Sequence, residues 1–540
     1  MVLADLNLKR KGDRDMRFSL RLMFLLGVVL VLLGLVSGIT MAKLGDQPLR
    51  FSWYMNYGWV SLPEWGTYPA DKWLLENLKV KVDWIPAGAQ PQEKVNTMIA
   101  ADDLPDVMVL ERGPDVERLV EAGKLVEITP FVKKYPGLRG QVGMKTLNML
   151  KSSDGKLYQI PNWYIAEGTA NGNTSFAIEK KIYKALGSLK LETYDDLLKY
   201  LRLVKAKYPN VVPLDLTSYG AAFIYATFGE NRTCNFLFWL FFPDKNQLRS
   251  VLDDPALKEA LLYLNRLYRE KLLNISFAST TMEQLKERAC NGRSAVWVEG
   301  DAVGIARDAN AILSAKDPED GWEIIWPIRK AGLDKNKVFI ADFNPLGWNV
   351  NVITKKAKDP ERIFEFLDWL TTPEGQAIIQ FGPPGLLWDK KDEDGVPIPN
   401  ETYMKMSEAE KGRLGLGVWN WVGNTTWVDT AKVKREMLLP PEKRDKGTMW
   451  QYNITWRVTR NGLEFSNIFP MPNSEEGIIY TRVKDIWTQY QPRIIMAKST
   501  AEALKYLNEA KKAFEKAGYD KTLKYMTAKW QENLKRMSSE

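Results

Sequence analysis

Strands and helices are expected to alternate along the first part of this chain. Residues 49–55 and 80–86 favour strands because they are rich in β-branched and aromatic side chains, and a helical pattern over 71–78 lies between them. A further helical stretch leads into the short apolar segment 107–110. Strands joined by helices in this way form βαβ units, so the sequence predicts an α/β fold with a mainly parallel sheet.

The rest of the chain continues this alternation and then changes character. An amphipathic helix is expected over 193–209, with Thr193 as its N-cap. Strands are expected at 295–298 and 348–356. Residues 388–475 are instead rich in Trp, Asn, Gly and Pro, and loop-like segments of this kind carry function more often than core elements do.

The N-terminal residues have the pattern of a secretory signal peptide. Arg17 and Arg21 precede the apolar run 22–36, and small residues follow it. The run is shorter than the roughly 20 apolar residues that cross a membrane. We expect residues 1–42 to be an export signal, and Met16 is an alternative start of the chain. The alternative role for this segment is an N-terminal anchor that is not cleaved.

Charge and histidine content exclude several classes of function. The formal net charge is +8, and Lys and Arg are scattered among Asp and Glu, so no basic surface for nucleic acid is expected. The chain has no histidine. Ser-His-Asp and Cys-His catalysis and most zinc sites are therefore excluded, whereas catalysis by carboxylates alone is not. We expect no metal and no cofactor.

The chain contains 20 tryptophans and two cysteines. Indole rings stack on the C–H faces of sugars, so an excess of Trp in an exported protein favours a carbohydrate ligand, although any single Trp is more often a core residue. Cys234 and Cys290 either form one disulfide or are two separate buried thiols, because sequence does not place their Cα atoms.

Several short motifs resemble the family 1 extracellular solute-binding proteins, in the subgroup that serves oligosaccharide importers. They occur in the order of that family and span roughly residues 45–540. The motifs are Leu104-Pro-Asp-Val-Met, the segment Val120–Tyr135, Asp154-Gly-Lys-Leu-Tyr-Gln-Ile-Pro, Thr193-Tyr-Asp-Asp-Leu-Leu, Trp348-Asn-Val-Asn-Val-Ile and Asp368-Trp-Leu-Thr-Thr-Pro-Glu-Gly.

This resemblance implies a two-lobed periplasmic-binding-protein fold of the type II kind, with a hinge and a ligand cleft between the lobes. We expect the N-terminal lobe to comprise residues 43–165 and 335–388, and the C-terminal lobe residues 166–334 and 389–540. The resemblance further implies a monomer that captures an oligosaccharide and delivers it to the membrane subunits of an ABC transporter.

Two departures from the family concern location and calcium. Relatives often carry a lipid on a Cys after the signal, and this chain has no Cys there, which favours a free periplasmic protein. Some relatives hold Ca²⁺ in a loop after the helix that matches 193–207. Here the segment Tyr208–Pro213 has too few oxygen ligands for Ca²⁺, and the acidic run 389–395 is interpreted as a solvated turn.

Candidate ligand-binding residues follow strand ends, predicted crossings between lobes, or the Trp-rich segment. For each of them, the alternative interpretation is a side chain that packs in the core. The candidates are Trp53, Tyr54, Trp59, Asn162, Trp163, Tyr164, Trp297, Glu299, Asp301, Asp342, Asn344, Trp348, Trp419, Trp421, Asn424 and Trp427, with Arg232, Trp239 and Trp388 as weaker candidates.

Two other functions compete with solute binding. A secreted glycoside hydrolase would also use Trp and carboxylates without histidine. Glu299 and Asp301 are the nearest candidate pair, but their spacing of two residues on one strand offers a poor geometry for one scissile bond. A lectin-like protein would more often show repeated β-sandwich strands than alternating strands and helices.

Overall fold

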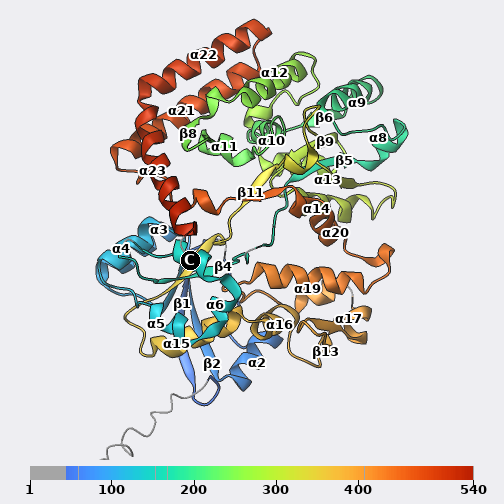
Figure 1. The fold of residues 1–540 in the computed structure, drawn as a ribbon. Coiled ribbons are helices and arrows are strands. Elements are labelled where there is room, and N and C mark those ends of the chain that lie inside the picture. Colours follow the sequence, from blue (N-terminus) through green and yellow to red (C-terminus); the bar gives the residue numbers. More distant parts are fainter. Residues whose placement is uncertain (1–43, 59, 153, 167, 407, 539–540) are drawn as a thin grey trace, which may run out of the picture.

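The computed structural model describes most of the chain and shows two lobes (Figure 1). The described residues are 44–538 without 59, 153, 167 and 407. The expected signal peptide at residues 1–42 lies outside them. Within the described part, no helix combines the length and the apolar character needed to cross a membrane.

The first lobe contains a five-stranded sheet in the order β2-β1-β3-β12-β4. Its strands are β1 (Leu49–Met55), β2 (Val80–Pro86), β3 (Val107–Leu110), β4 (Gln159–Asn162) and β12 (Asn349–Ile353). β1 pairs in parallel with β2 and β3, whereas β12 lies antiparallel between β3 and β4. Every residue of β3 and β12 is buried, as expected for a sheet covered on both faces. The expected α/β class is confirmed.

Helices cover this sheet and build the core of the first lobe. They are α2 (Pro69–Asn77), α3 (Pro91–Ala101), α4 (Pro114–Glu121), α5 (Thr129–Lys134), α6 (Pro136–Val142), α7 (Met144–Met149), α15 (Pro360–Thr371), α16 (Pro373–Phe381), α17 (Glu401–Lys405), α18 (Glu408–Arg413) and α19 (Thr425–Met437), with a β13–β14 hairpin of Trp388–Lys391 and Pro397–Pro399. Proline at the first turn of α2 to α6, α15 and α16 presets the helical φ where no amide donor is needed.

The segment from Trp388 to Ala431 packs with this first lobe, which differs from the expected assignment of residues 389–540 to the second lobe. Trp388, Trp419 and Val428 are buried in the cluster around the five-stranded sheet. The cause is α19, which packs its buried face against α16 of the first lobe.

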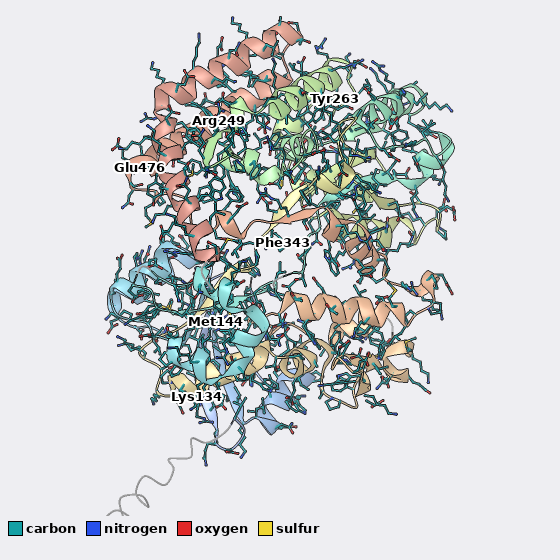
Figure 2. All side chains as sticks on the ribbon, in the orientation of Figure 1. Lys134, Met144, Arg249, Tyr263, Phe343 and Glu476 are labelled. Atoms are coloured by element: carbon teal, nitrogen blue, oxygen red, sulfur yellow. The ribbon has the colours of Figure 1, made fainter. Side chains whose placement is uncertain are left out.

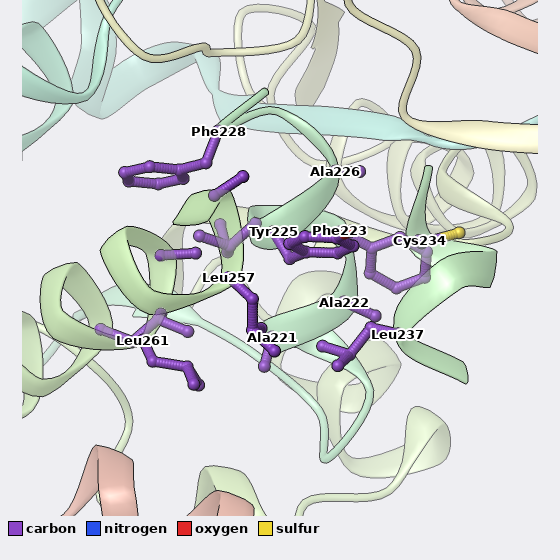
Figure 3. Close-up of a cluster of buried hydrophobic side chains, with 14 of the residues drawn as sticks. Ala221, Ala222, Phe223, Tyr225, Ala226, Phe228, Cys234, Leu237, Leu257 and Leu261 are labelled. Atoms are coloured by element: carbon purple, nitrogen blue, oxygen red, sulfur yellow. The ribbon is translucent and has the colours of Figure 1, made fainter. Parts of the chain in front are cut away.

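The second lobe contains a four-stranded sheet in the order β10-β5-β9-β6. Its strands are β5 (Ser175–Glu179), β6 (Val212–Asp215), β9 (Ser294–Glu299) and β10 (Trp322–Ile325), and a β7–β8 hairpin spans Phe241–Asp244 and Gln247–Ser250. The lobe's helices are α8 (Lys180–Ala185), α9 (Tyr194–Lys207), α10 (Gly220–Ala226), α11 (Cys234–Trp239), α12 (Pro255–Arg269), α13 (Met282–Cys290), α14 (Ala302–Leu313), α20 (Lys446–Asn453), α21 (Glu475–Ile495), α22 (Thr500–Ala517) and α23 (Tyr519–Ser538). Figure 3 shows part of its core, where α10 and α11 pack on α12.

Local signals explain several of these helices. Thr193 is the N-cap of α9, as expected, because its hydroxyl accepts the Asp196 amide while Asp196 accepts the Thr193 amide. Asp254 caps α12 in a similar way by accepting the Ala256 amide. The helix begins where these side chains satisfy amides that lack partners within the helix.

The chain crosses between the lobes in three places. The first crossing lies between β4 and β5, the second between β10 and β12, and the third between α19 and α20. A two-stranded ribbon of β11 (Ala341–Phe343) and β15 (Thr459–Asn461) lies between the lobes, and Figure 2 labels Phe343 there. In addition, α23 extends from the second lobe and contacts α7 of the first (Figure 1).

Candidate functional site

The carboxyl ends of the parallel strands in both lobes point toward the crossings. In the first lobe, Leu110 at the end of β3 pairs with Val350, the second residue of β12 after the second crossing. In the second lobe, Glu299 at the end of β9 pairs with Ser175, the first residue of β5 after the first crossing. Ligands of open α/β sheets bind at the carboxyl ends of their strands. The candidate site is therefore the cleft between these two ends.

The first-lobe side of the cleft carries three aromatic rings, here called the aromatic platform: Tyr57, Trp348 and Trp421. The ring centroids of Tyr57 and Trp348 are 4.9 Å apart. Tyr57 and Trp421 are 6.2 Å apart with ring planes only 17° from parallel. Trp348 remains 39% exposed, so this indole is accessible from the cleft.

A tight turn holds Trp348 on the platform. Gly347 has a φ of +69°, and a Cβ there would lie 1.9 Å from the Asn162 carbonyl oxygen. Arg112 donates from Nη1 to the carbonyl oxygens of Leu346 and Gly347, at 3.1 and 2.5 Å. Burial lowers the pKa of Arg112, and Glu111 partly offsets that effect. The turn is therefore fixed by both steric fit and a charged donor.

Tyr57 is fixed by the end of β3. Its hydroxyl donates to Glu111 Oε1 at 2.7 Å. Burial and this hydrogen bond raise the pKa of Tyr57, so the hydroxyl remains protonated at neutral pH. The platform thus has a polar edge with a carboxylate beside its flat faces.

A buried amide network connects the platform to the first crossing. Asn162 donates from Nδ2 to Asn349 Oδ1 at 2.9 Å and accepts the Gly423 amide at 2.7 Å. Asn351 donates to the Trp421 carbonyl oxygen at 2.6 Å. Trp163, partly buried, lies directly against Gly423, where an added Cβ would meet its ring at 2.5 Å.

The second lobe contains a cavity of about 690 Å³, here called the second-lobe pocket. It lies at the end of β9 among α10, α11 and α21, within the size range of small-molecule sites. Its lining includes Tyr219, Phe223, Phe238, Phe277, Met282 and Glu299. A hinge residue contacts its edge, because Thr174 Oγ1 donates to the Gly300 carbonyl oxygen at 3.0 Å.

Glu299 is buried and lines this pocket. One carboxylate oxygen accepts the Thr217 hydroxyl and the other accepts the Gly300 amide. Burial raises the pKa of Glu299, and those hydrogen bonds oppose the shift. Asp301, the other half of the sequence-derived pair, is exposed and caps α14 by accepting the Gly304 amide.

Many of the sequence-derived site residues are core residues instead. Trp53 is fully buried, and its indole donates to Asn351 Oδ1 at 2.9 Å. The physical reason is that helices cover both faces of the sheets, so side chains within a strand lie in the core whichever way they point. The buried candidates are Trp53, Tyr54, Asn162, Tyr164, Trp297, Glu299, Trp419, Trp421, Asn424 and Trp427, and the weaker candidate Trp388; of these, Trp421 packs under the platform and Glu299 lines the second-lobe pocket.

Other candidates have structural partners near the hinge or in the second lobe. Asp342 accepts Arg460 Nε at 2.9 Å and the Thr233 hydroxyl, which holds the interlobe ribbon. Asn344 accepts the Leu346 amide in the turn before Trp348. The weaker candidates pack in the second lobe: Arg232 pairs with Asp254 and Trp239 contacts Phe465. Trp59 lies outside the described residues.

Sequence reasoning missed Tyr57, Glu111 and Arg112, and in the second lobe Tyr219 and Phe238. The first three directly follow β1 and β3, so the rule of strand ends could have found them with better boundaries. No comparable signal marks Tyr219 and Phe238, which come together only when α10 and α11 pack.

The described part of the chain has neither a disulfide between its two cysteines nor a cluster of metal-ligating side chains. Cys234 and Cys290 are both free thiols, which answers the question left open by the sequence. Burial raises the pKa of both. The described residues also contain no group of three or more Cys, Asp or Glu side chains that could hold a metal ion.

Known proteins with related sequences cover part of this chain. The chain is 24% identical over 329 residues to the lipoprotein LipO of Bacillus subtilis, covering 58% of this chain and 62% of that protein. It is 28% identical over 158 residues to the fructooligosaccharide ABC transporter substrate-binding protein FusA of Streptococcus pneumoniae, covering 26% and 29%. The matches therefore span less than two thirds of each relative.

Solved structures match nearly the whole chain. Alginate-binding protein AlgQ2 without calcium ion matches with a TM-score of 0.60 at 17% identity, covering 91% of this chain and 99% of that one. FusA of S. pneumoniae in complex with kestose matches with a TM-score of 0.62 at 16% identity, covering 90% and 99%. These likenesses confirm the two-lobed fold.

The family model for bacterial extracellular solute-binding proteins matches residues 61–377, from the loop after β1 through most of α16. That match includes every strand of the two sheets except β1, and it includes the first two crossings. The chain therefore belongs to the bacterial extracellular solute-binding protein family.

Proposed function

We propose that this protein captures an oligosaccharide in the cleft between its lobes and delivers it to the membrane subunits of an ABC importer. It acts outside the cytoplasmic membrane as a monomer, with residues 1–42 as its export signal or as a retained anchor. The observation that carries this proposal is the aromatic platform at the carboxyl edge of the first sheet, opposite a cavity in the second lobe.

The platform has the chemistry that sugar rings require. Tyr57 and Trp421 are nearly parallel, and Trp348 offers an accessible indole face for the C–H surface of a pyranose. Glu111 and Arg112 lie beside these rings and can exchange hydrogen bonds with sugar hydroxyls. Flat apolar faces with charged groups at their edge are what an amphipathic sugar needs.

The names of the similar proteins agree with this chemistry. FusA is named as a fructooligosaccharide-binding component, AlgQ2 as an alginate-binding protein, and a further structural match as a binder of HMO. We extend from these names only the class of ligand, an oligosaccharide.

Delivery depends on lobe closure. A ligand that touches both the platform and the second-lobe pocket binds the closed form more tightly, so it shifts the population toward closure. The size of that shift is limited by the difference in affinity for the open and closed forms. The closed form is the one that the membrane subunits would recognise.

A panel of oligosaccharides tests this proposal by tryptophan fluorescence and by the shift in melting temperature, with the products analysed for cleavage. The expected result is saturable binding with intact sugar. Release of shorter sugars would favour a glycoside hydrolase, and a response to peptides but to no sugar would contradict the proposal. A lectin-like role predicts binding without closure, which small-angle scattering distinguishes by an unchanged radius of gyration.

A further inference from the structure

Three aromatic rings in the second-lobe pocket form a corner. The rings of Tyr219 and Phe238 are 5.8 Å apart with planes at 85°, and those of Phe223 and Phe238 are 6.0 Å apart at 86°. A flat sugar face can stack on one ring of such a corner only, because the next ring stands perpendicular to it. A compact group that enters between perpendicular rings contacts two of them at once.

This corner is accessible and has an apolar base. Tyr219 is 62% exposed and Phe238 is 37% exposed. Behind them, Phe223, Leu237 and Phe277 are buried, and Figure 3 shows Phe223 and Leu237 within the apolar cluster of α10 and α11. Exposed aromatic side chains over an apolar base cost free energy until something apolar covers them.

The pocket offers few polar partners at this corner. Glu299 is buried, and both of its carboxylate oxygens already accept hydrogen bonds from Thr217 and Gly300. Ser218 beside Tyr219, and Lys484, Thr488 and Gln491 on α21, also line the cavity, and all four are exposed or only partly buried rather than enclosed by the three rings. A sugar hydroxyl placed against the corner would lose its bonds to water without replacement, which costs about 1–3 kcal/mol.

We propose that the ligand presents to the second-lobe pocket a sugar residue with a compact substituent that ends in a methyl group, such as an acetyl group, with the methyl between the rings and the carbonyl toward the open side of the pocket. This inference rests on the proposed function and names the class of oligosaccharide that the cleft selects. The platform binds the faces of the sugar rings, and the corner of Tyr219, Phe223 and Phe238 binds the substituent.

Matched pairs of oligosaccharides test the inference. Each pair shares its backbone and differs in the substituent: chitotriose with cellotriose, and acetylated with deacetylated xylotriose. Dissociation constants are measured by calorimetry for the wild type, for Phe238→Ala and for Tyr219→Ala. In at least one pair, the acetylated member should bind at least about tenfold more tightly to the wild type, as expected for an apolar group in a fitting pocket.

The variants locate the effect in the corner. In Phe238→Ala and Tyr219→Ala, the advantage of the acetylated member over its plain partner should shrink to less than about threefold. Leu203→Ala is the control, since Leu203 is similarly exposed at 40% but lies on α9, outside the pocket lining. Melting temperatures of the unliganded variants separate misfolding from lost binding, and Tyr219 is exposed enough for its variant to fold.

The possible results separate this inference from the proposed function. If plain members bind as tightly as acetylated members, or if the advantage persists in both variants, the inference is overturned while oligosaccharide binding stands. If none of a wider saccharide panel binds, the proposed function fails and the inference fails with it.

Discussion

The two walls of the candidate site, one in each lobe, have different aromatic geometry. In the first lobe, Tyr57 stacks on the buried Trp421 with ring planes 17° from parallel, and Trp348 beside them offers an exposed flat indole face. In the second lobe, Tyr219 and Phe238 meet at 85°. A flat surface fits the broad face of a sugar ring, whereas a corner fits a small substituent. One ligand can therefore be recognised by two kinds of contact.

The walls also differ in how they are held. The platform rings come from three distant segments, around residues 57, 348 and 421, and hydrogen bonds from Arg112 and Asn351 fix the main chain beneath them. The corner rings come from two neighbouring helices, α10 and α11, and are fixed by apolar packing. The platform should therefore be sensitive to backbone changes and the corner to side-chain size.

The largest effect is expected from Gly347→Ala. A Cβ there meets the Asn162 carbonyl oxygen at 1.9 Å, and φ is +69°. Strain and displaced backbone should lower the free energy of unfolding by about 3 kcal/mol. Urea unfolding measures this, with Gly140→Ala as control, because Gly140 lies within α6 and has no atom within 4 Å of its added Cβ. Equal stability of the two variants would contradict a sterically fixed platform.

Trp348→Ala should mainly lower affinity. Loss of an accessible indole from a ligand-binding surface costs about 2 kcal/mol, or roughly 30-fold in Kd. Stability should change less, because Trp348 is 39% exposed. Trp369→Ala is the matched control: Trp369 stacks on Trp73 at 12° on α15, so it should affect melting without affecting affinity. Calorimetry with the oligosaccharide found by the panel gives both values.

Removing a hydroxyl from each wall should give unequal results. Tyr57→Phe removes the donor to Glu111 and should weaken binding by about fivefold, close to 1 kcal/mol. Tyr219→Phe should leave Kd unchanged, because the Tyr219 hydroxyl has no hydrogen-bond partner among the described residues and the corner acts through its rings. If Tyr219→Phe lost as much affinity as Tyr57→Phe, both walls would depend on their tyrosine hydroxyls to bind the ligand.

The smallest effect concerns pH and the second lobe alone. Hydrogen bonds from Arg202, and further ones from Arg266, lower the pKa of Glu270 to about 2. The folded form is thus favoured above the unfolded pKa near 4.5, and this contribution is lost as pH falls toward 2. Glu270→Gln should reduce stability by about 1 kcal/mol at pH 7, the scale of a surface ion pair, and by less at pH 3.

Binding provides the control for that variant. Arg202 and Glu270 lie on α9 and at the end of α12, away from both walls. The Kd of Glu270→Gln at pH 7 should equal that of the wild type. A difference in stability that stays constant from pH 7 to pH 3 would contradict the pKa shift.

The fold was predictable from the sequence where local signals are strong. Strands 49–55 and 80–86 and the capped helix from Thr193 appear as expected. The segment 389–437 was placed in the wrong lobe, because its Trp-rich pattern has no period that indicates which core will bury it. Only the packing of α19 on α16 decides that question.

The site was harder to predict than the fold. Trp348, Trp421 and Trp163 were among the sequence candidates, and the structure brings them to the cleft side of the first lobe or its first crossing. Trp53 and Trp297 follow the same composition argument yet are fully buried. Exposure depends on where each strand ends, and a one-residue error in that boundary exchanges a core residue for a cleft residue.

The position of β12 has a consequence for the order in which the chain can fold. This strand lies between β3 and β4, and Trp53 donates to Asn351, 298 positions later. Until residues 349–353 emerge from the ribosome, β3 and β4 have no partner between them, and the first lobe has an open edge. A nascent chain shorter than this cannot complete the first-lobe sheet, whereas every strand of the second-lobe sheet has been made by residue 325.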